Sequence, residues 1–180
     1  NRNKNKFLTI LKLKYLFEST NIIPGRYEIK PSMTYVELME DIFEGNLQQF
    51  RFTIIEGTVA KDALRKLRQI IKNNNLNFQI SSKTLEIFSK ESLILPDTYF
   101  FTDRQQLERL MINQKIRLDN ILTRLWKNKP KDNPLKSINE ALILASIVER
   151  EAAVEWERAQ ISSVFLSRIR DGWRLDADPT

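Results

Sequence analysis

The chain contains no cysteine and no histidine among its 180 residues, and these two absences exclude a large part of enzyme chemistry. Without cysteine there is no disulfide, no thiolate metal site and no cysteine nucleophile. Without histidine, Ser-His and Cys-His catalysis and the commonest zinc ligand are excluded as well. Any catalysis must therefore rest on carboxylates, hydroxyls, lysine, tyrosine or a hard cation bound by oxygen atoms.

Glycine, proline and long apolar runs are also scarce. With 4 Gly, 6 Pro and a hydrophobic content of 42%, the composition is that of a globular protein rather than a disordered one. No stretch reaches the ~18 apolar residues of a membrane span, and no signal-peptide pattern opens the chain. Because the chain begins at Asn1 and stops abruptly at Thr180, we expect it to be a trimmed piece of a longer protein.

The charge is basic. The 29 Lys and Arg residues against 23 Asp and Glu give a net charge of +6 and a pI near 9.5, which suits a polyanion or an anionic surface. A nucleic-acid binder is therefore one hypothesis. The sequence lacks the aromatic-interleaved basic motifs of RNA-recognition folds, so we do not expect nucleic acid as a partner.

The spacing of apolar residues predicts an α+β fold. Helical periodicity occurs near residues 7–17, 34–45, 59–73, 103–127, 137–151 and 157–170, and alternation predicts strands at 26–30 and 50–55. Ser137 with Glu140 forms a capping-box pattern, and Gly45 and Gly172 are predicted helix stops. Pro96 interrupts the apolar run 93–101, for which we predict a structured turn rather than a central strand.

Two carboxylates, Glu149 and Glu151, follow an almost entirely apolar helical segment. At about 100° per residue they point roughly 200° apart and cannot act side by side. Glu151 stands one turn after Ile147 and Val148, and an apolar surround disfavours the ionised form of a carboxyl, which suits a general acid. The alternative is that both are ordinary end-of-helix glutamates paired with arginines, Arg150 or Arg158.

Three passages resemble one known family. The run Ala-Ser-Ile-Val-Glu-Arg-Glu at 145–151, followed by Glu157-Arg158, Val164-Phe165, Arg168 and Asp178-Pro179-Thr180, closely resembles the signature of the endolytic murein transglycosylases of the MltG (YceG-like) family. The segment Leu-Pro-Asp-Thr-Tyr at 95–99 is similar to that family's Pro-Asp-Thr motif. Pro-Gly-Arg-Tyr at 24–27, with Met33-Thr34, Leu38 and Gly45, is similar to its LysM-like N-terminal part.

The resemblance implies an architecture and an activity. It implies a small LysM-like subdomain in residues 1–48 and a mostly helical α+β catalytic domain in 49–180 whose C-terminal part is missing. The implied enzyme is an endolytic lytic transglycosylase that cleaves the MurNAc-GlcNAc β-1,4 bond within peptidoglycan strands and leaves 1,6-anhydroMurNAc ends. The implied location is the cytoplasmic membrane, with an N-terminal single-pass anchor absent from these residues and a catalytic domain on the extracytoplasmic side.

The same resemblance assigns the catalytic role to Glu151, first as acid and then as base, with no cofactor and no metal. Peptidoglycan strands are the implied substrate, and cell-wall synthesis proteins are implied partners. The substrate-binding candidates are Glu149, Arg168, Asp97, Thr98, Asp178 and Thr180. Two positions depart from the family pattern, with Ala152 where Thr is usual and Glu91-Ser92 where Glu-Gly is usual.

Several of these candidates have structural alternatives. Glu149 either orients Arg150 or Arg168 or is a solvated helix residue. Adjacent Glu157 and Arg158 are predicted to form an ion pair that fixes the last helix against the one before it, with contact to substrate as the alternative. Asp97 and Thr98 follow a proline, where such residues commonly close turns. The aromatic residues Tyr99 and Trp173 stack on sugar faces or pack in the core. For the whole protein, the alternative to an enzyme is a non-catalytic peptidoglycan-binding module.

Overall fold

The structure, a computed structural model, describes residues 6, 8–9, 12–13, 22–89 and 94–173. Most of the helix predicted at 7–17 lies outside these residues, as do Glu91-Ser92, Asp178 and Thr180. The fold is α+β, as the sequence predicted. The chain divides into two compact units, which are Asn1–Arg51 with Phe100–Leu107, and Phe52–Tyr99 with Glu108–Thr180. The boundary between residues 48 and 49 and the LysM-like character of the first part stay predictions.

Helix α2 (Tyr35–Glu44) confirms the helix predicted near residues 34–45, with Gly45 as its predicted stop. The Thr34 hydroxyl accepts from the Glu37 amide at 3.3 Å, and the Glu37 carboxylate accepts from the Thr34 amide at 2.6 Å, which completes a capping box. The backbone bond from Thr34 lowers the pKa of Glu37, and its hydroxyl lowers it further. Gly45 ends the helix in the left-handed conformation at φ 75°.

The strand predicted at residues 26–30 is wrong. The structure describes this segment throughout, and it forms no strand. Its recorded backbone bond to a distant residue runs from the Gln48 amide to the Arg26 carbonyl at 2.8 Å, and the Tyr27 hydroxyl donates to the nearby Ile23 carbonyl. Alternation describes a segment with two different faces, but a strand also requires a partner along its whole length.

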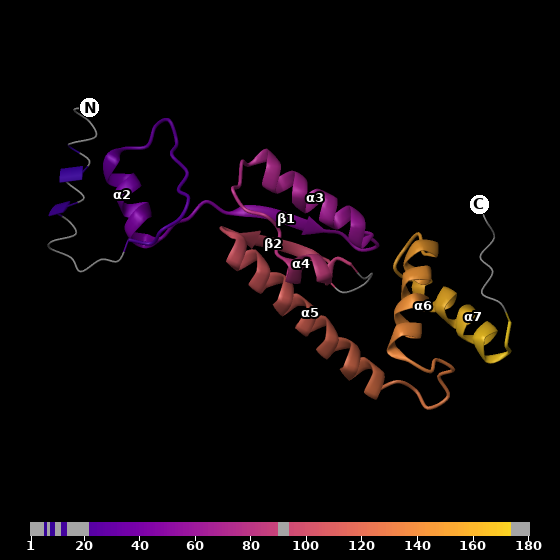
Figure 1. Ribbon diagram of the computed structural model, residues 1–180. Helices are drawn as coiled ribbons and strands as arrows, with labels where there is room; N and C mark the ends of the chain where they lie inside the picture. Colours follow the sequence, from indigo (N-terminus) through magenta and orange to yellow (C-terminus); the bar gives the residue numbers. More distant parts are fainter. Residues whose placement is uncertain (1–5, 7, 10–11, 14–21, 90–93, 174–180) are drawn as a thin grey trace. The chain divides into compact units, whose positions relative to one another are not determined.

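Strands β1 (Phe50–Ile54) and β2 (Asp97–Phe101) pair in a two-stranded sheet. Each step forward along β1 is matched by a step backward along β2, so the pair is antiparallel, as Figure 1 shows. This register is fixed by three cross-strand contacts, namely Phe50–Phe101 at 5.8 Å between ring centroids, Phe52–Tyr99 at 6.1 Å, and the Thr53 and Thr98 hydroxyls at 3.1 Å. The β1 prediction is confirmed.

The structured turn predicted for residues 93–101 is wrong where β2 lies. Pro96 comes immediately before the first residue of β2 rather than inside the strand. A proline at that place removes no hydrogen bond from the ladder, so it does not prevent a strand from following.

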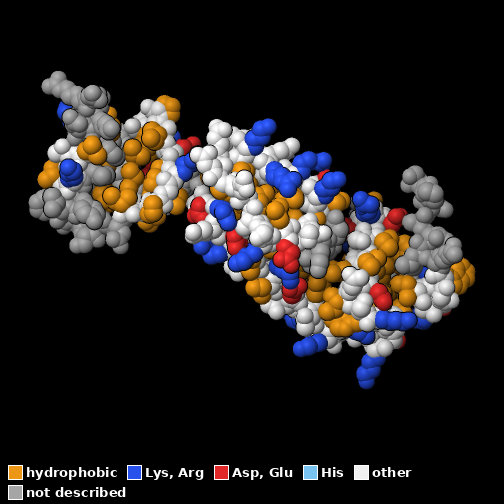
Figure 2. Space-filling view, in the orientation of Figure 1, with side chains coloured by type: hydrophobic (Ala, Val, Ile, Leu, Met, Phe, Trp, Pro, Cys, Tyr) orange, Lys and Arg blue, Asp and Glu red, His pale blue; other side chains and the backbone are white. Residues whose placement is uncertain are grey.

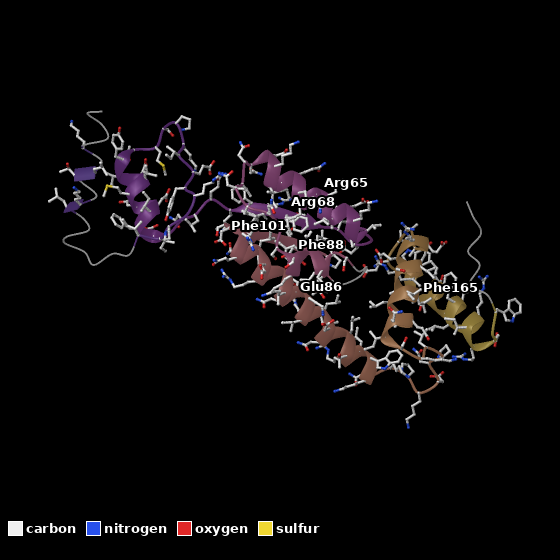
Figure 3. All side chains as sticks on the ribbon, in the orientation of Figure 1. Arg65, Arg68, Glu86, Phe88, Phe101 and Phe165 are labelled. Atoms are coloured by element: carbon white, nitrogen blue, oxygen red, sulfur yellow. The ribbon has the colours of Figure 1, made fainter. Side chains whose placement is uncertain are left out.

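One face of the sheet carries the aromatic core. Phe52 and Phe101 are 0% exposed, and the Phe52 ring lies 6.3 Å from that of Phe88, which is labelled in Figure 3. Phe88 follows α4 (Ser82–Ile87), a helix that the sequence did not predict because its six residues are too few to establish a period. The Ser81 hydroxyl caps α4 by accepting from the Thr84 amide at 3.2 Å.

Helices α3 (Ala60–Asn73) and α5 (Arg104–Lys127) confirm the predicted helical segments. Leu67 of α3 is 0% exposed, and Lys66 donates to the Thr53 carbonyl of β1 at 3.0 Å. Helix α5 buries Leu107 and Met111, whereas two of its other apolar residues are exposed, Ile116 and Leu125.

Helices α6 (Ile138–Glu151) and α7 (Glu157–Arg170) close the described chain and pack on each other. Their shared core contains Leu135, Leu144, Val148 and Phe165, the last of which is labelled in Figure 3. Val164, which precedes buried Phe165 on α7, is exposed. Gly172 stops α7 at φ 73°, as predicted, with the Trp173 amide donating back to the Arg168 carbonyl at 2.8 Å. None of the helices in the described ranges is long and apolar enough to span a membrane.

Candidate active site

The two candidate glutamates lie in the last turn of α6, and the start of that helix sets their direction. The Ser137 hydroxyl accepts from the Glu140 amide at 3.2 Å, as the capping-box pattern predicted. The Glu140 carboxylate accepts from the Lys136 amide at 2.7 Å instead of from Ser137, so the box closes one residue earlier than expected. With Leu144 and Val148 buried on the α7 side, the rotation of α6 is fixed.

Glu149 is held by Arg158. Arg158 donates from Nε to Oε2 at 3.1 Å and from Nη2 to Oε1 at 3.2 Å, a two-point contact that joins the end of α6 to the start of α7. The side chains are 31% and 43% exposed for Glu149 and Arg158, so the pair is partly shielded from water. Of the partners that the sequence suggested for Glu149, the structure has Arg158.

The ion pair predicted between Glu157 and Arg158 is wrong. The Glu157 carboxylate instead accepts from the amides of Ala153 at 3.1 Å and Val154 at 3.4 Å. Neighbouring residues on a helix point about 100° apart, so Glu157 can serve the backbone of the preceding turn while Arg158 reaches α6. Together these bonds hold residues 152–156, the connection between α6 and α7, in place.

Glu151 is the last residue of α6, and its side chain is exposed. Within the described ranges, no hydrogen bond or ion pair occupies its carboxylate. The apolar surround expected from the sequence is therefore wrong. Val148, one turn earlier, is buried toward α7, but the chain leaves the helix at Ala152, which is extended with φ −79° and ψ 115°, so no further turn covers Glu151.

The candidates on β2 are engaged in local structure. Asp97 Oδ1 accepts from the Thr98 amide at 2.7 Å, and the Thr98 hydroxyl contacts that of Thr53. Their neighbour Tyr99 is 3% exposed and donates its hydroxyl hydrogen to the Leu95 carbonyl. Burial raises the pKa of Tyr99 to about 12, with Asp97 raising it further and Arg117 lowering it. Tyr99 therefore packs in the core, which was the predicted alternative to stacking on a sugar.

The remaining candidates are not brought together with Glu151 by any recorded contact. Arg168 on α7 places its guanidinium 5.8 Å from the centroid of the Phe165 ring. Asp178 and Thr180 lie outside the described residues. Binding roles for these residues, and for Glu149, Asp97 and Thr98, stay predictions. No group of three acidic side chains suited to a metal ion occurs in the part of the chain that the structure describes.

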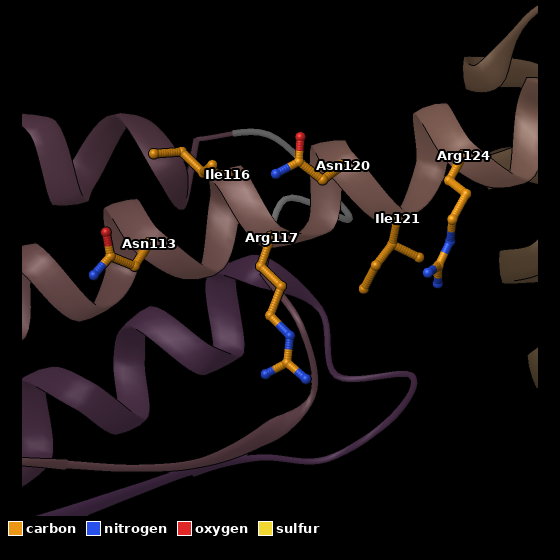
Figure 4. A pocket seen from close by; sticks show the side chains of 6 residues that line it. All are labelled: Asn113, Ile116, Arg117, Asn120, Ile121 and Arg124. Atoms are coloured by element: carbon orange, nitrogen blue, oxygen red, sulfur yellow. The ribbon is translucent and has the colours of Figure 1, made fainter.

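A hollow of about 450 Å³ lies along α5, and its lining includes none of the candidate residues (Figure 4). Its lining comes from a single helix and consists of Asn113, Ile116, Arg117, Asn120, Ile121 and Arg124. Because one helix supplies the whole lining, the hollow is an open groove between side chains rather than a cleft between elements. Its volume alone does not make this groove a better candidate for the active site than the exposed carboxylate of Glu151.

One exposed aromatic residue near Glu151 was passed over in the sequence. Trp156 lies five residues later, in the connection between α6 and α7, and is 68% exposed. The available signal was its closeness in the chain to the candidate acid, together with an aromatic surface on which a sugar ring can pack.

Comparison with known proteins defines the class of this chain. The YceG-like family matches residues 2–180, and the chain therefore belongs to that family.

Among curated proteins, the chain is similar to the endolytic murein transglycosylase of Bacillus subtilis (strain 168). The two are 25% identical over 179 residues, which cover 87% of this chain and 49% of the relative. The chain thus spans about half the length of the curated relative that it matches.

Proposed function

We propose that the protein is an endolytic peptidoglycan lytic transglycosylase in which Glu151 acts as both acid and base. One observation carries the choice of residue. Of the two glutamates at the end of α6, Glu149 is held at two points by Arg158, whereas Glu151 is exposed and, among the described residues, unpaired. Membership of the YceG-like family and the name of the Bacillus subtilis relative support the reaction class.

In the proposed reaction, protonated Glu151 donates its proton to the glycosidic oxygen between MurNAc and GlcNAc as the bond to the MurNAc anomeric carbon breaks. The C6 hydroxyl of the same MurNAc forms the new bond to that carbon. The Glu151 carboxylate takes the hydroxyl proton and is again protonated. The products are a free GlcNAc hydroxyl and a 1,6-anhydroMurNAc end, and no water is consumed.

This reaction needs a single free carboxyl. Hydrolytic glycosidases use two, set about 5 Å or about 6.5–9.5 Å apart, one of which activates water or attacks the sugar. Glu149 is poorly suited to that second role because both of its oxygen atoms accept from Arg158. The attacking hydroxyl belongs to the substrate itself, so the protein has mainly to hold the sugar in a reactive pose.

The proposal extends to the setting of the enzyme. Its substrate is the interior of peptidoglycan strands, and its partners are cell-wall synthesis proteins. The full-length protein is anchored in the cytoplasmic membrane with the catalytic domain facing the wall. Residues 1–48 form a LysM-like part, and Arg168, Asp97, Thr98, Asp178 and Thr180 contribute to substrate binding.

Product analysis tests the proposal. Purified peptidoglycan is digested with the full-length protein, and the fragments are identified by mass spectrometry. New internal 1,6-anhydroMurNAc ends are expected. Reducing ends would mean hydrolysis and a second catalytic carboxyl, and binding without any cleavage would favour a peptidoglycan-binding module.

A further inference from the structure

We propose that Trp156 is a substrate-positioning residue whose exposed indole stacks on an amino-sugar ring of the glycan strand beside Glu151. The inference rests on the proposed function and adds to it the residue that holds the sugar. It concerns the connection between α6 and α7, residues 152–156, which carries Trp156 immediately before the first residue of α7.

Packing against the described residues does not account for Trp156. The side chain is 68% exposed, whereas Trp126, a second tryptophan in this unit, packs against the core shared by α6 and α7. A tryptophan that is buried removes about 150–250 Å² of surface from water, and most of that gain is lost here. Figure 2 shows hydrophobic side chains gathered over α6 and α7, and the exposed residues of this region include Ile143, Val154, Trp156 and Val164.

Helix capping does not account for Trp156 either. The residue occupies the N-cap position of α7, and its side chain makes no capping hydrogen bond. Indole offers no acceptor oxygen, so Ser, Thr, Asp or Asn would serve better at this position. The free amides near the turn are instead served by the Glu157 carboxylate. Neither local structure nor the core therefore calls for a tryptophan.

The connection is rigid enough to position a ligand. The Ala152 amide donates to the Val148 carbonyl at 2.9 Å, Glu157 holds the next two amides, and Arg158 ties the start of α7 to Glu149. Trp156 and Glu151 are five residues apart, so their Cα atoms are separated by at most about 18 Å even in an extended chain. The bends and turn at residues 153–156 shorten that reach. The exposed carboxyl of Glu151 and the exposed indole of Trp156 thus lie at the two ends of one short connection that hydrogen bonds hold in place.

The chemistry of this pair fits a sugar ring. A pyranose has a face of C–H groups that packs on an aromatic surface, and polar edges that remain free for hydrogen bonds. The flat, rigid indole provides a large contact area at little cost in side-chain entropy. With one ring held on Trp156, the neighbouring glycosidic oxygen can be presented to Glu151.

Binding is measured first, without cleavage. The full-length protein carrying Glu151→Gln is titrated with soluble, uncleaved peptidoglycan strands, alone and combined with Trp156→Ser, Trp156→Phe or Leu125→Ala. Trp156→Ser is expected to weaken binding about tenfold, and Trp156→Phe to retain most of it. Leu125→Ala is the control, because Leu125 is a 60% exposed apolar side chain on α5 that the proposed site does not include, so its removal is expected to leave affinity unchanged.

Urea unfolding of the same variants separates positioning from folding. Serine caps a helix better than tryptophan, so Trp156→Ser is expected to be at least as stable as its parent. In the active protein, which keeps Glu151, Trp156→Ser is expected to raise KM about tenfold and to change kcat less than twofold. Unchanged affinity and KM in Trp156→Ser would overturn the proposal while leaving the transglycosylase assignment intact. Loss of binding in a protein that cleaves nothing would instead support the stacking role and contradict the enzymatic assignment.

Discussion

Arg158 donates two hydrogen bonds to Glu149, from Nε at 3.1 Å and from Nη2 at 3.2 Å, and so fastens the first turn of α7 to the last turn of α6. The contact joins residues nine positions apart across the connection that carries Trp156. It leaves Glu151, two residues further along, as the exposed carboxylate of the pair.

Replacing Arg158 with lysine tests this fastening. Lysine keeps the charge but lacks the planar fork that engages both carboxylate oxygens, so Arg158→Lys is expected to lower the free energy of unfolding by about 1 kcal/mol. Urea denaturation measures the change. Arg170→Lys is the control, because Arg170 makes only long contacts with exposed Asp132, at 3.7 Å to its carboxylate and 3.4 Å to its carbonyl, and an equal loss there would contradict the special role of Arg158.

The aromatic face of the sheet gives a second prediction. Phe52 is 0% exposed and lies against the rings of Tyr99 and Phe88, so Phe52→Ala is expected to cost roughly 3–5 kcal/mol. Phe100 on the opposite face of β2 is 49% exposed, and Phe100→Ala is expected to cost far less. Equal midpoints for the two variants in thermal unfolding would mean that the buried face has been misassigned.

Because of Tyr99, the free energy of unfolding is expected to depend on pH in the alkaline range. Burial raises its pKa to about 12, whereas the unfolded chain releases this proton near the ordinary value of 10.0. Between these values the folded state binds more protons, so the free energy of unfolding falls as pH rises from about 10 toward 12. Tyr99→Phe is expected to flatten that fall, and the phenolate absorbance near 295 nm should lose its last titration step. Identical alkaline profiles for the two proteins would refute the prediction.

Two glycines with the same backbone conformation provide a further test. Gly45 and Gly172 have φ of 75° and 73°, so alanine at either position carries the strain of the left-handed region, about 1–2 kcal/mol. A Cβ at Gly45 would also meet the Ile23 side chain, whereas at Gly172 none of the described residues lies within 4 Å of it. Gly45→Ala is therefore expected to be the more destabilising change. The reverse order in urea titrations would contradict the packing described for α2.

Patterns local in the chain predicted local structure well. Ser137 with Glu140 and the helix-stop glycines at 45 and 172 each act on backbone groups only a few residues away, and the structure places each largely as expected. These signals depend on backbone groups that must be satisfied at every helix end.

Contacts between distant segments were harder to predict. The alternation at 26–30 resembles that of β1, but only β1 has a partner, and that partner follows Pro96 more than forty residues later. Glu157 and Arg158 are neighbours in sequence, yet their side chains diverge and Arg158 instead reaches Glu149. The exposure of Glu151 was not predicted, because it depends on the chain leaving the helix at Ala152.

The central claim is that Glu151 carries the reaction, and one comparison tests it most directly. Peptidoglycan is digested with the full-length protein, with Glu151→Gln, and with Glu155→Gln, which alters another exposed glutamate in the same connection. Mass spectrometry then counts the 1,6-anhydroMurNAc ends. The account predicts abundant new ends with the parent and with Glu155→Gln, and a loss of at least a hundredfold with folded Glu151→Gln, in line with the contribution of a general acid. Undiminished anhydro ends with Glu151→Gln would contradict it.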